Sequence, residues 1–361
     1  MNKFFIDKDI RKANTLPSDF YREEKYFHES KEKIFARTWQ FVDDTDNVRL
    51  GGQLFPHTLL KGFLDEPVLF VRDKEDKLNC ISNVCTHRGN ILVENSCVEQ
   101  NIRCRYHGRK FKLNGEFQSM PEFEEAENFP SEKDNLPKIP FAQWEKFLFA
   151  SVKPKISFEE IISEMKSRIS FLPLNEFKLD AVRSRDYLVK ANWALYCENY
   201  LEGFHIPFVH NGLNKLLDYG SYATEIYKYS NLQLGIARSG EDCFDIPKSS
   251  PDYGKKIAAY YFWIFPNTMF NFYPWGLSVN VVRPLSVDLT KVSFITYIYD
   301  EKKFQQGADE MLDKVEREDE SIVENVQKGI RSRFYESGRY SPKREQGTHH
   351  FHRLIAEFMN G

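Results

Sequence analysis

Residues 85–108 read CTHRGNILVENSCVEQNIRCRYHG, and they constrain the architecture more than any other part of the chain. A thiol and an imidazole alternate in both end motifs, in Cys85 and His87 and again in Cys104 and His107. A Cys2His2 zinc finger instead keeps its two cysteines together and its two histidines together. Two loops that each offer one sulfur and one nitrogen suit a two-iron cluster with thiolates on one iron and imidazoles on the other. We expect such a cluster, with a structural zinc site as the alternative.

Glycine follows each ligand pair, at Gly89 and Gly108. A glycine lets the backbone turn tightly after the histidine, and it can bring N–H groups toward the cluster sulfur. The plainer interpretation is a simple turn.

Short β-type segments surround these motifs. Runs rich in β-branched and aromatic residues alternate with turn residues, including Asn114-Gly115, a strong signal for a two-residue hairpin. The expected strands cover residues 67–72, 78–84, 109–113 and 147–152. They predict a small all-β domain over residues 41–155.

The pattern changes at Ser157. Ser157 and Glu160 have the spacing of a capping box, which opens an amphipathic helix. Beyond it we expect a strand, a motif-bearing helix from about Asn192, aromatic strands and a long charged helix, at residues 177–189, 192–205, 260–299 and 308–335. With a helical segment near residues 30–39, the chain is predicted to be α+β. The expected parts are an N-terminal helical segment (1–40) that packs on the second domain, the β domain (41–155) and that second domain (156–361).

A second group of metal-binding residue types lies in ENYLEGFHIPFVH, residues 198–210. Glu202 and His205 share a stripe of the expected helix, because residues three or four apart are neighbours there. His210 is five positions beyond His205 and would point about 140° away on an unbroken helix. Pro207 cannot continue the hydrogen-bond ladder, so we expect the helix to open or end between the two histidines and His210 to swing back beside His205.

The third ligand is expected from the charged helix. Its apolar stripe is read as Leu312, Val315, Ile322, Val326 and Ile330. Asp319 falls on that stripe, and a lone carboxylate on a buried face needs a cation. Two imidazoles and one carboxylate form the facial triad of non-haem Fe(II) oxygenases, which predicts a site of His205, His210 and Asp319. The alternatives are a locally paired Asp319 and two ordinary core histidines.

The bulk composition narrows the partners. The chain has 361 residues, 41% hydrophobic content and a formal charge of −3 without a basic block, so neither nucleic acid nor an anionic membrane is indicated and a small-molecule partner is favoured. The longest apolar run, residues 257–265, is far shorter than the roughly 20 residues of a spanning helix. Six cysteines are too few for a disulfide framework, and we expect a cytoplasmic protein.

Taken together, these motifs resemble those of the Rieske-type ring-hydroxylating oxygenases, specifically their catalytic α subunit. The resemblance covers nearly the whole chain and rests on NVCTHRG, CRYHG, ENYLEGFHIPFVH, EDESIVENVQKGI and HHFHR. It implies a Rieske [2Fe–2S] domain followed by a helix-grip catalytic domain with an antiparallel sheet. Cys85 and Cys104 would hold the outer iron, and His87 and His107 the inner one. The triad His205, His210 and Asp319 would hold a mononuclear Fe(II).

The resemblance also implies partners. Glu202, with Asn199 beside it as a second catalytic residue, would link His107 of one subunit to an iron ligand of the next, which predicts a head-to-tail homotrimer. Because the chain carries no dinucleotide or flavin motif, electrons from NAD(P)H would come from a separate reductase, with or without a ferredoxin. The protein would then be a terminal oxygenase that uses O2 to hydroxylate an aromatic ring or a methylated amine.

Two positions depart from the family pattern. The bridging acid is more often Asp than Glu, although quaternary-ammonium oxygenases also use Glu, and the usual Asn-Trp-Lys reads Asn192-Trp193-Ala194.

The aromatic run at residues 260–275 could line an arene pocket, form a cation cage or simply be core. The histidines of HHFHR are expected to be a packing or surface feature.

Two other classes of protein remain open on the sequence alone. One is a non-catalytic Rieske electron carrier fused to a ligand-binding module, which would bind two irons per chain instead of three. The other is a zinc-stabilised binding module, which would be colourless where an iron–sulfur protein is red-brown.

Overall fold

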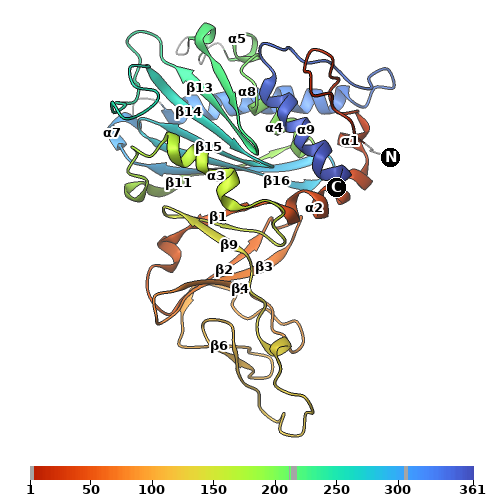
Figure 1. Ribbon diagram of the computed structural model, residues 1–361, viewed down its shortest axis with the longest axis vertical. Helices are drawn as coiled ribbons and strands as arrows, with labels where there is room; N and C mark the ends of the chain where they lie inside the picture. The colour runs from red at the N-terminus through yellow and green to blue at the C-terminus, as the bar shows by residue number, and fades with distance from the viewer. Residues whose placement is uncertain (1–3, 211, 213–217, 305–307) are drawn as a thin grey trace. The chain divides into compact units, whose positions relative to one another are not determined.

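The computed structural model describes the chain except for residues 1–3, 211, 213–217 and 305–307 and the side chains of residues 308–312 (Figure 1). Contacts between Cα atoms divide it into two compact units, residues 36–155 and residues 1–35 with 156–361. We call them the β unit and the mixed unit. No helix among the described residues is long and apolar enough to cross a membrane.

The β unit consists of three small antiparallel sheets. Their strand orders are β1-β10-β9, β4-β3-β2-β5 and β6-β7-β8. The strands are β1 (Gln40–Asp44), β2 (Gln53–Leu59), β3 (Glu66–Arg72), β4 (Leu78–Ser82), β5 (Cys97–Val98), β6 (Ile102–Arg103), β7 (Lys110–Phe111), β8 (Phe117–Ser119), β9 (Phe141–Trp144) and β10 (Phe147–Ala150), with 3-10 turns η2 (Thr45–Val48) and η3 (Glu132–Asp134). The expected all-β character and the turn at Gly115, with φ of 87°, are confirmed.

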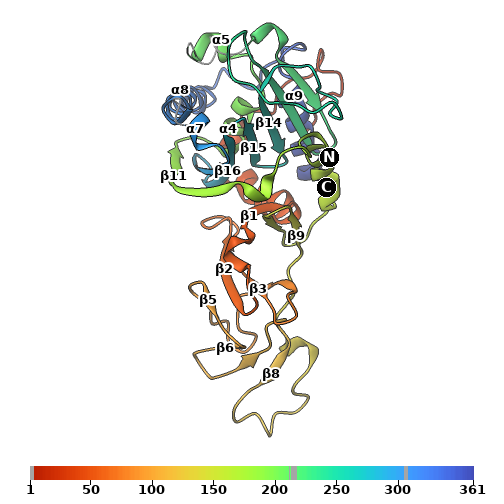
Figure 2. The ribbon, with the colours of Figure 1, turned by 90° about the vertical axis from the view of Figure 1, so that its left-hand side faces the viewer.

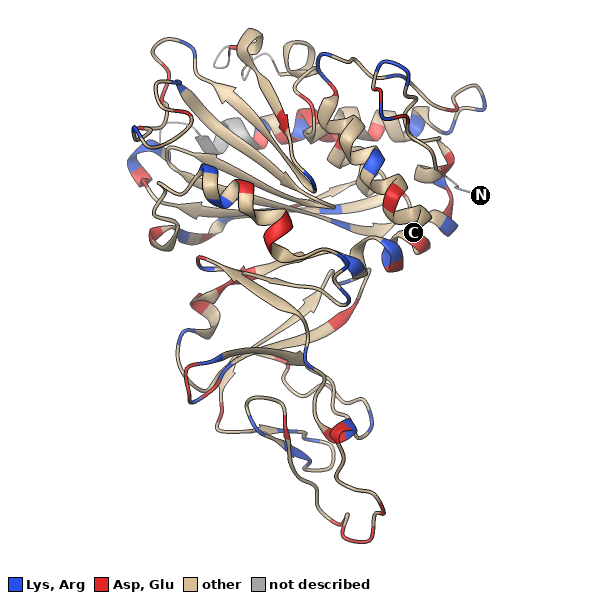
Figure 3. Ribbon diagram, viewed as in Figure 1, with Lys and Arg blue, Asp and Glu red and all other residues tan. Residues whose placement is uncertain are grey.

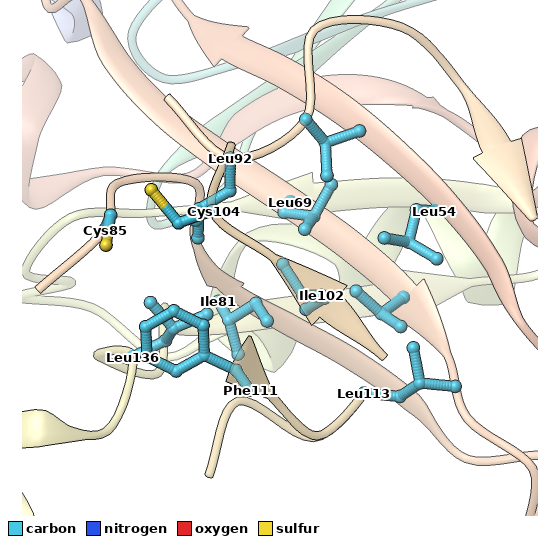
Figure 4. Packing of buried hydrophobic residues seen from close by; sticks show 12 residues of the cluster. Leu54, Leu69, Ile81, Cys85, Leu92, Ile102, Cys104, Phe111, Leu113 and Leu136 are labelled. Atoms are coloured by element: carbon cyan, nitrogen blue, oxygen red, sulfur yellow. The ribbon is translucent and has the colours of Figure 1, made fainter. Parts of the chain in front are cut away.

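One hydrophobic core of this unit ends at the two cysteine motifs. Leu54, Leu69 and Leu113 belong to the cluster, and so do the buried Cys85 and Cys104. In Figure 4 the two cysteines lie at the same end of the cluster, away from Leu54 and Leu113. The apolar core therefore supports both cysteine loops from one side.

The mixed unit is built around an antiparallel sheet with seven strands among the described residues, in the order β11-β17-β16-β15-β14-β13-β12 (Figures 1 and 2). The strands are β11 (Lys178–Val189), β12 (Ala223–Ile226), β13 (Ser230–Ile236), β14 (Ile257–Ile264), β15 (Thr268–Tyr273), β16 (Gly276–Ser286) and β17 (Leu289–Ile298). The helical elements are α1 (Asp19–Arg22), α2 (Glu24–Lys33), η1 (Phe35–Arg37, at the boundary of the units), α3 (Phe158–Arg168), η4 (Leu174–Glu176), α4 (Trp193–Tyr200), α5 (Ile206–Val209), η5 (Tyr219–Ser221), α7 (Glu301–Phe304), α8 (Ala308–Gly329) and α9 (Gln346–Asn360).

The helix α4 lies at the centre of the mixed unit. It packs on β16, and both α8 and α9 pack on α4. Its N-cap Asn192 accepts a hydrogen bond from the N–H of Ala194 at 3.0 Å, which satisfies one of the free donors at the helix start. Trp193 is fully buried and meets Phe35 of the N-terminal segment at 4.8 Å between ring centroids. Because of these neighbours, α4 is a fixed platform for the residues that follow it.

The α+β prediction is confirmed, and two element boundaries are corrected. The expected helical segment near residues 30–39 was placed too late in the chain: α2 covers Glu24–Lys33, residues 35–37 form a 3-10 turn and a strand begins at Gln40. The long helix α8 ends at Gly329 rather than near residue 335, because glycine suits a helix end. The capping box at Ser157 is confirmed, since its N–H donates to the Glu160 carboxylate at 3.0 Å.

The expected apolar stripe of α8 is also corrected. Ile322 and Val326 are 39% and 42% exposed, and Leu312 lies outside the described side chains. Ile330 of the expected stripe is buried, and the other buried positions of this segment are Glu316, Val323 and Gln327. These positions recur at helical spacing, so the helix is rotated relative to the expectation and buries two polar residues.

Candidate metal centres

The two cysteine loops of the β unit have the same backbone pattern. The N–H of Cys85 donates to the carbonyl of Asn90 at 2.8 Å, and the N–H of Gly89 donates to the carbonyl of Cys85 at 3.0 Å. In the second loop, the N–H of Cys104 donates to the carbonyl of Arg109 at 2.8 Å, and the N–H of Gly108 donates to the carbonyl of Cys104 at 3.0 Å. Gly89 and Gly108 have φ of 72° and 76°, a region that favours glycine. The glycine N–H groups thus close turns on carbonyl oxygens, as the plainer interpretation predicted.

The loops bring the four predicted cluster residues together. The rings of His87 and His107 have centroids 4.8 Å apart, and the amide of Asn90 donates to the sulfur of Cys104 at 3.7 Å. Burial and the adjacent Cys104 thiol raise the pKa of the Cys85 thiol. Burial and the His107 ring lower the pKa of His87. These shifts favour the neutral thiol of Cys85 and the neutral imidazole of His87.

One nitrogen of this group has no partner. Nδ1 of His107 is buried and makes no hydrogen bond with any described residue. The ring itself is held by Tyr106, which stacks on it at 3.7 Å between centroids. A buried nitrogen without a partner is costly unless a metal or a water satisfies it. This orphaned atom, beside two thiols and a second imidazole, fits the donor set of a mixed cysteine and histidine cluster.

In the mixed unit the chain breaks twice between Tyr200 and His210. The helix α4 ends at Tyr200, earlier than expected, and α5 begins only after His205, which is its N-cap. Pro207 lies at the start of α5, where its missing N–H is not needed, so it starts a helix rather than ending one. Gly203 lies in the break, and a Cβ atom there would approach the Tyr222 ring to 2.7 Å. The early break therefore allows a close contact that only glycine tolerates.

This geometry brings the three predicted iron ligands together. His205, His210 and Asp319 each offer a ligand atom, and these atoms lie within 4.8 Å of one another. Oδ1 of Asp319 lies 3.0 Å from Nε2 of His210 and 3.5 Å from Nε2 of His205. The two imidazole rings are 5.0 Å apart at an angle of 78°. Within the described residues this is the one such group of three that could hold a metal ion.

The other nitrogen of each imidazole faces a second carboxylate. Nδ1 of His205 lies 2.6 Å from Oε1 of Glu202, and Nδ1 of His210 lies 2.8 Å from Oε2 of Glu318. Such partners fix the ring orientation and make the free nitrogen a better ligand. Burial alone would lower the pKa of His210, but its bonds to Asp319 and Glu318 raise it. Glu318 was not identified from the sequence.

Asn199 is placed to orient the third ligand. Its side-chain amide donates to Oδ1 of Asp319 at 2.6 Å. Asn199 comes from the last turn of α4 and Asp319 from the middle of α8, so this bond links the two helices at the site.

A pocket opens from the three ligands into the mixed unit. Asn199, Glu202, His205, His210 and Asp319 line it together with sheet residues. Four tyrosines contribute to its wall: Tyr200, Tyr222, Tyr261 and Tyr273. None of the described residues that line it is Lys or Arg.

The histidines of HHFHR serve packing, as expected. His349 and His352 on α9 are buried, the first beside the carbonyl of Asp7 at 2.7 Å and the second beside the hydroxyl of Tyr340 at 2.6 Å. Nε2 of His352 also lies 3.0 Å from Glu198. These partners are protein groups of the N-terminal and C-terminal segments, so the cluster ties the two chain ends to α4.

Comparison with known proteins decides the family. Residues 176–361 match the model of the ring hydroxylating alpha subunit (catalytic domain), and residues 38–130 match the Rieske [2Fe-2S] domain. The choline monooxygenase of Arabidopsis thaliana is 30% identical over 96% of this chain and 83% of its own length. The chain belongs to the Rieske ring-hydroxylating oxygenase α subunits.

Other relatives of this Rieske oxygenase support the same family assignment. The oxygenase subunit of carnitine monooxygenase from Escherichia coli is 28% identical over 96% of this chain and 94% of its own length. A solved quaternary ammonium Rieske monooxygenase has a TM-score of 0.80 and 26% identity, covering 97% of this chain and 96% of that one. A naphthalene 1,2-dioxygenase from Rhodococcus, at 16% identity and a TM-score of 0.75 over 96% and 94% of the two chains, shares the fold.

Membership in this family confirms three predictions. The protein is a terminal oxygenase of the Rieske non-haem iron type, and its cofactors are a [2Fe–2S] cluster in the Rieske domain and a mononuclear iron in the catalytic domain. The zinc-stabilised module and the non-catalytic electron carrier are thereby disfavoured. The donor sets described above fit both groups.

Proposed function

We propose that this oxygenase inserts one oxygen atom of O2 into a C–H bond of a small methylated amine. The observation that carries the proposal is the pocket beside His205, His210 and Asp319, which is walled by tyrosines and has no Lys or Arg among its described lining residues. Aromatic faces attract a quaternary ammonium group by cation–π interaction, worth about 2 kcal/mol when water is excluded. The names of the choline and carnitine monooxygenases among its relatives agree with this substrate class.

The tyrosines are suited to hold a cation through their rings. The centroids of Tyr261 and Tyr273 are 5.9 Å apart at 79°, so their faces point in different directions. Burial raises the pKa of Tyr261 to about 12, and burial also raises those of Tyr200, Tyr222 and Tyr273. The phenols therefore stay neutral at physiological pH. Tyr200 is fixed by its hydroxyl, which donates to Oδ1 of Asn271 at 2.7 Å.

We assign the cluster ligands as Cys85 and Cys104 on the outer iron and His87 and His107 on the inner iron, within a Rieske domain of residues 41–155. His205, His210 and Asp319 hold the mononuclear iron within residues 156–361. Residues 1–35 share that unit in the structure, whereas residues 36–40 belong to the β unit. When bound, the cluster supplies electrons and the mononuclear iron activates O2. With two electrons and two protons, the reaction converts substrate C–H and O2 to C–OH and H2O.

The remaining residues orient the ligands and the substrate. Glu202 and Glu318 fix which nitrogen of each imidazole faces Asp319, and Asn199 holds that carboxylate by its amide. Glu202 also accepts N–H bonds from Phe204 and, at 3.1 Å, from His205, which stiffens the chain break. The ligand positions are thus set by the protein before substrate arrives.

The same acid is assigned to electron transfer between subunits. We assign Glu202 to the bridge from His107 of a neighbouring subunit to His205, in a head-to-tail homotrimer, because its carboxylate already contacts the ligand ring at 2.6 Å. A separate NAD(P)H-dependent reductase, with or without a ferredoxin, supplies the electrons. The six free cysteines suit a reducing compartment, and we place the enzyme in the cytoplasm.

Isotope labelling tests the reaction. The iron-loaded enzyme with a surrogate reductase and NADH is given choline, carnitine, glycine betaine, toluene or naphthalene under 18O2, and the products are analysed by mass spectrometry. One 18O atom in the product of a methylated amine is expected. Two labelled atoms, or label only in an arene product, would contradict the proposal.

A pair of variants tests whether the ring of Tyr261 binds the ammonium group of the substrate. Tyr261→Phe keeps the ring, whereas Tyr261→Leu removes it with little change in bulk. The leucine variant should raise KM for the ammonium substrate by about 3-fold to 30-fold, the equivalent of about 0.5–2 kcal/mol, and the phenylalanine variant should stay within about 2-fold. Equal KM values for the two variants would show that the ring face does not bind the substrate.

A further inference from the structure

Glu316 is a buried acid at the pocket whose carboxyl is only half satisfied. It lies on α8 with 4% of its surface exposed and lines the pocket with Asp319. Oε2 accepts a hydrogen bond from the Tyr196 hydroxyl at 2.7 Å. Oε1 is buried and finds no hydrogen-bond partner among the described residues.

The described residues of the pocket wall offer this carboxyl no lysine or arginine partner. Burial and the charge of Asp319 raise its pKa well above the ordinary value, against the effect of Tyr196. No Lys or Arg occurs among the described residues of the pocket wall, and no ion pair of Glu316 is found with any described residue. A buried acid with a free oxygen is costly unless something that enters the pocket compensates it.

We propose that Glu316 is the counter-charge for the ammonium head of the substrate, and that the substrate is therefore a small permanent cation without a carboxylate, such as an amino alcohol or an alkylammonium ion. This inference rests on the proposed function and narrows it. An ammonium group beside this carboxyl lowers its pKa again, so that the ionised carboxylate and the tyrosine faces together form a cage for a net cation. Glu316 does not stand out in the sequence, because acidic residues are numerous on α8.

The same residues disfavour a zwitterionic substrate. A betaine or carnitine carries a carboxylate, which proteins most often bind with an arginine. Among the described residues of the wall, that group would meet only neutral donors, such as the amides of Gln233 and Asn280, and the negative Glu316 and Asp319. Asp319 neutralises only one of the two charges of a ferrous ion, so an added carboxylate at Glu316 also lowers the repulsion that a cationic substrate meets near the metal.

Binding measurements test the inference without turnover. The anaerobic, iron-loaded enzyme is titrated by calorimetry with choline, with 3,3-dimethylbutan-1-ol, which has the same shape without the charge, and with glycine betaine. The wild type should bind choline roughly 10-fold or more tightly than either of the other two ligands. Glu316→Gln keeps the shape and an acceptor for Tyr196. It should weaken choline roughly 10-fold to 100-fold and leave the neutral alcohol within about 2-fold.

Glu320→Gln is the matched control, since it removes the same charge from the same helix outside the pocket wall. It should leave all three affinities within about 2-fold. An equal loss for choline and the alcohol in Glu316→Gln, or no loss of either, overturns the role of Glu316. If Glu316→Gln does not fold, the wild-type affinities test the inference by themselves. A wild type that prefers choline to the neutral alcohol by less than about 3-fold overturns the role of Glu316 as well. A wild type that binds no ammonium ligand but hydroxylates an arene refutes the proposed function itself.

Discussion

The carboxylate of Glu318 lies 2.8 Å from Nδ1 of His210, while its neighbour Asp319 lies 3.0 Å from Nε2 of the same ring. Two consecutive residues of α8 thus hold both nitrogens of one imidazole. The helix presents Asp319 as the proposed ligand and the preceding Glu318 as the group that orients His210. This arrangement makes iron binding depend on Glu318, although Glu318 is not expected to touch the metal.

Glu318→Gln should lower the affinity for the mononuclear iron by about 10-fold to 100-fold, because a neutral amide makes His210 a weaker and less fixed ligand. Iron content after dialysis against graded concentrations of chelator measures this loss. The cluster absorbance should not change. Glu320→Gln, two positions along the helix, serves as the control, and equal iron retention in the two variants would assign Glu318 a merely structural role.

Asp319→Ala should remove the mononuclear iron and abolish turnover while the visible and EPR spectra of the [2Fe–2S] cluster persist. The reason is that the alanine leaves two imidazoles and no carboxylate in the site, which then lacks one of three protein ligands. Counting iron and acid-labile sulfide per chain gives the readout, with a fall from three irons to two. Full activity in this variant would mean that another acid is the ligand.

The proposed cysteine and histidine ligands of the cluster could be predicted from the sequence because each pair lies in one tight loop. Residues 85–89 and 104–108 form the same turn, so spacing alone carries the geometry. The helix break at Gly203 was harder, since Pro207 suggested the right event at the wrong position. A proline is compatible with both the end and the start of a helix, and only the packing of Tyr222 decides.

Glu316 and Gln327 could not be found from hydrophobic periodicity. Both are polar, yet they lie on the buried face of α8, whereas Ile322 and Val326 are more than a third exposed. Hydrophobic periodicity assigns the apolar residues of a helix to the core. It therefore selects the wrong helix face wherever a functional site or a buried hydrogen bond places polar side chains inside. Here Gln327 accepts from the N–H of Asn192 at 2.8 Å, which ties α8 to the start of α4.

Arg109→Met should lower the reduction potential of the cluster by tens of millivolts, since 59 mV corresponds to a tenfold change for one electron. The guanidinium is 2% exposed and lies 5.0 Å from the Phe117 ring, and its charge opposes the burial that raises the pKa of the Cys85 thiol. Removing a positive charge near the cluster disfavours the added electron. Asp134→Asn, which removes the counter-charge 2.5 Å away, should shift the potential upward. EPR-monitored redox titration measures both, and shifts of the same sign would show that packing rather than charge is responsible.

Arg168→Met should destabilise the mixed unit by about 3–5 kcal/mol, because it leaves a buried charge without its main partner. The guanidinium holds Glu225 at 2.8 Å and the fully buried Asp252 at the same distance, while Lys255 is the second cation on Asp252. For a unit of this size the melting temperature should fall by about 2–4 °C per kcal/mol. Calorimetry on the wild type, on this variant and on Lys166→Met, an exposed cation of the same helix, measures the difference. A shift no larger than that of the lysine control would show that the buried pair adds nothing to stability.

Asp43→Asn should stabilise the β unit above pH 6 and leave it unchanged near pH 3. Burial raises the folded-state pKa of Asp43 to about 6, even though the N–H of Asp44 donates to it at 2.8 Å and Lys146 is nearby. A carboxyl with a raised folded-state pKa contributes stability that is fully present below its unfolded pKa of about 3.9 and is lost as the pH rises through about 6. At pH 7.5 the ionised group therefore costs about 1–3 kcal/mol, which asparagine avoids while it still accepts the Asp44 bond. Melting temperatures of the β unit from pH 3 to 8 provide the measurement, and parallel curves for wild type and variant would show that Asp43 does not titrate between the two states.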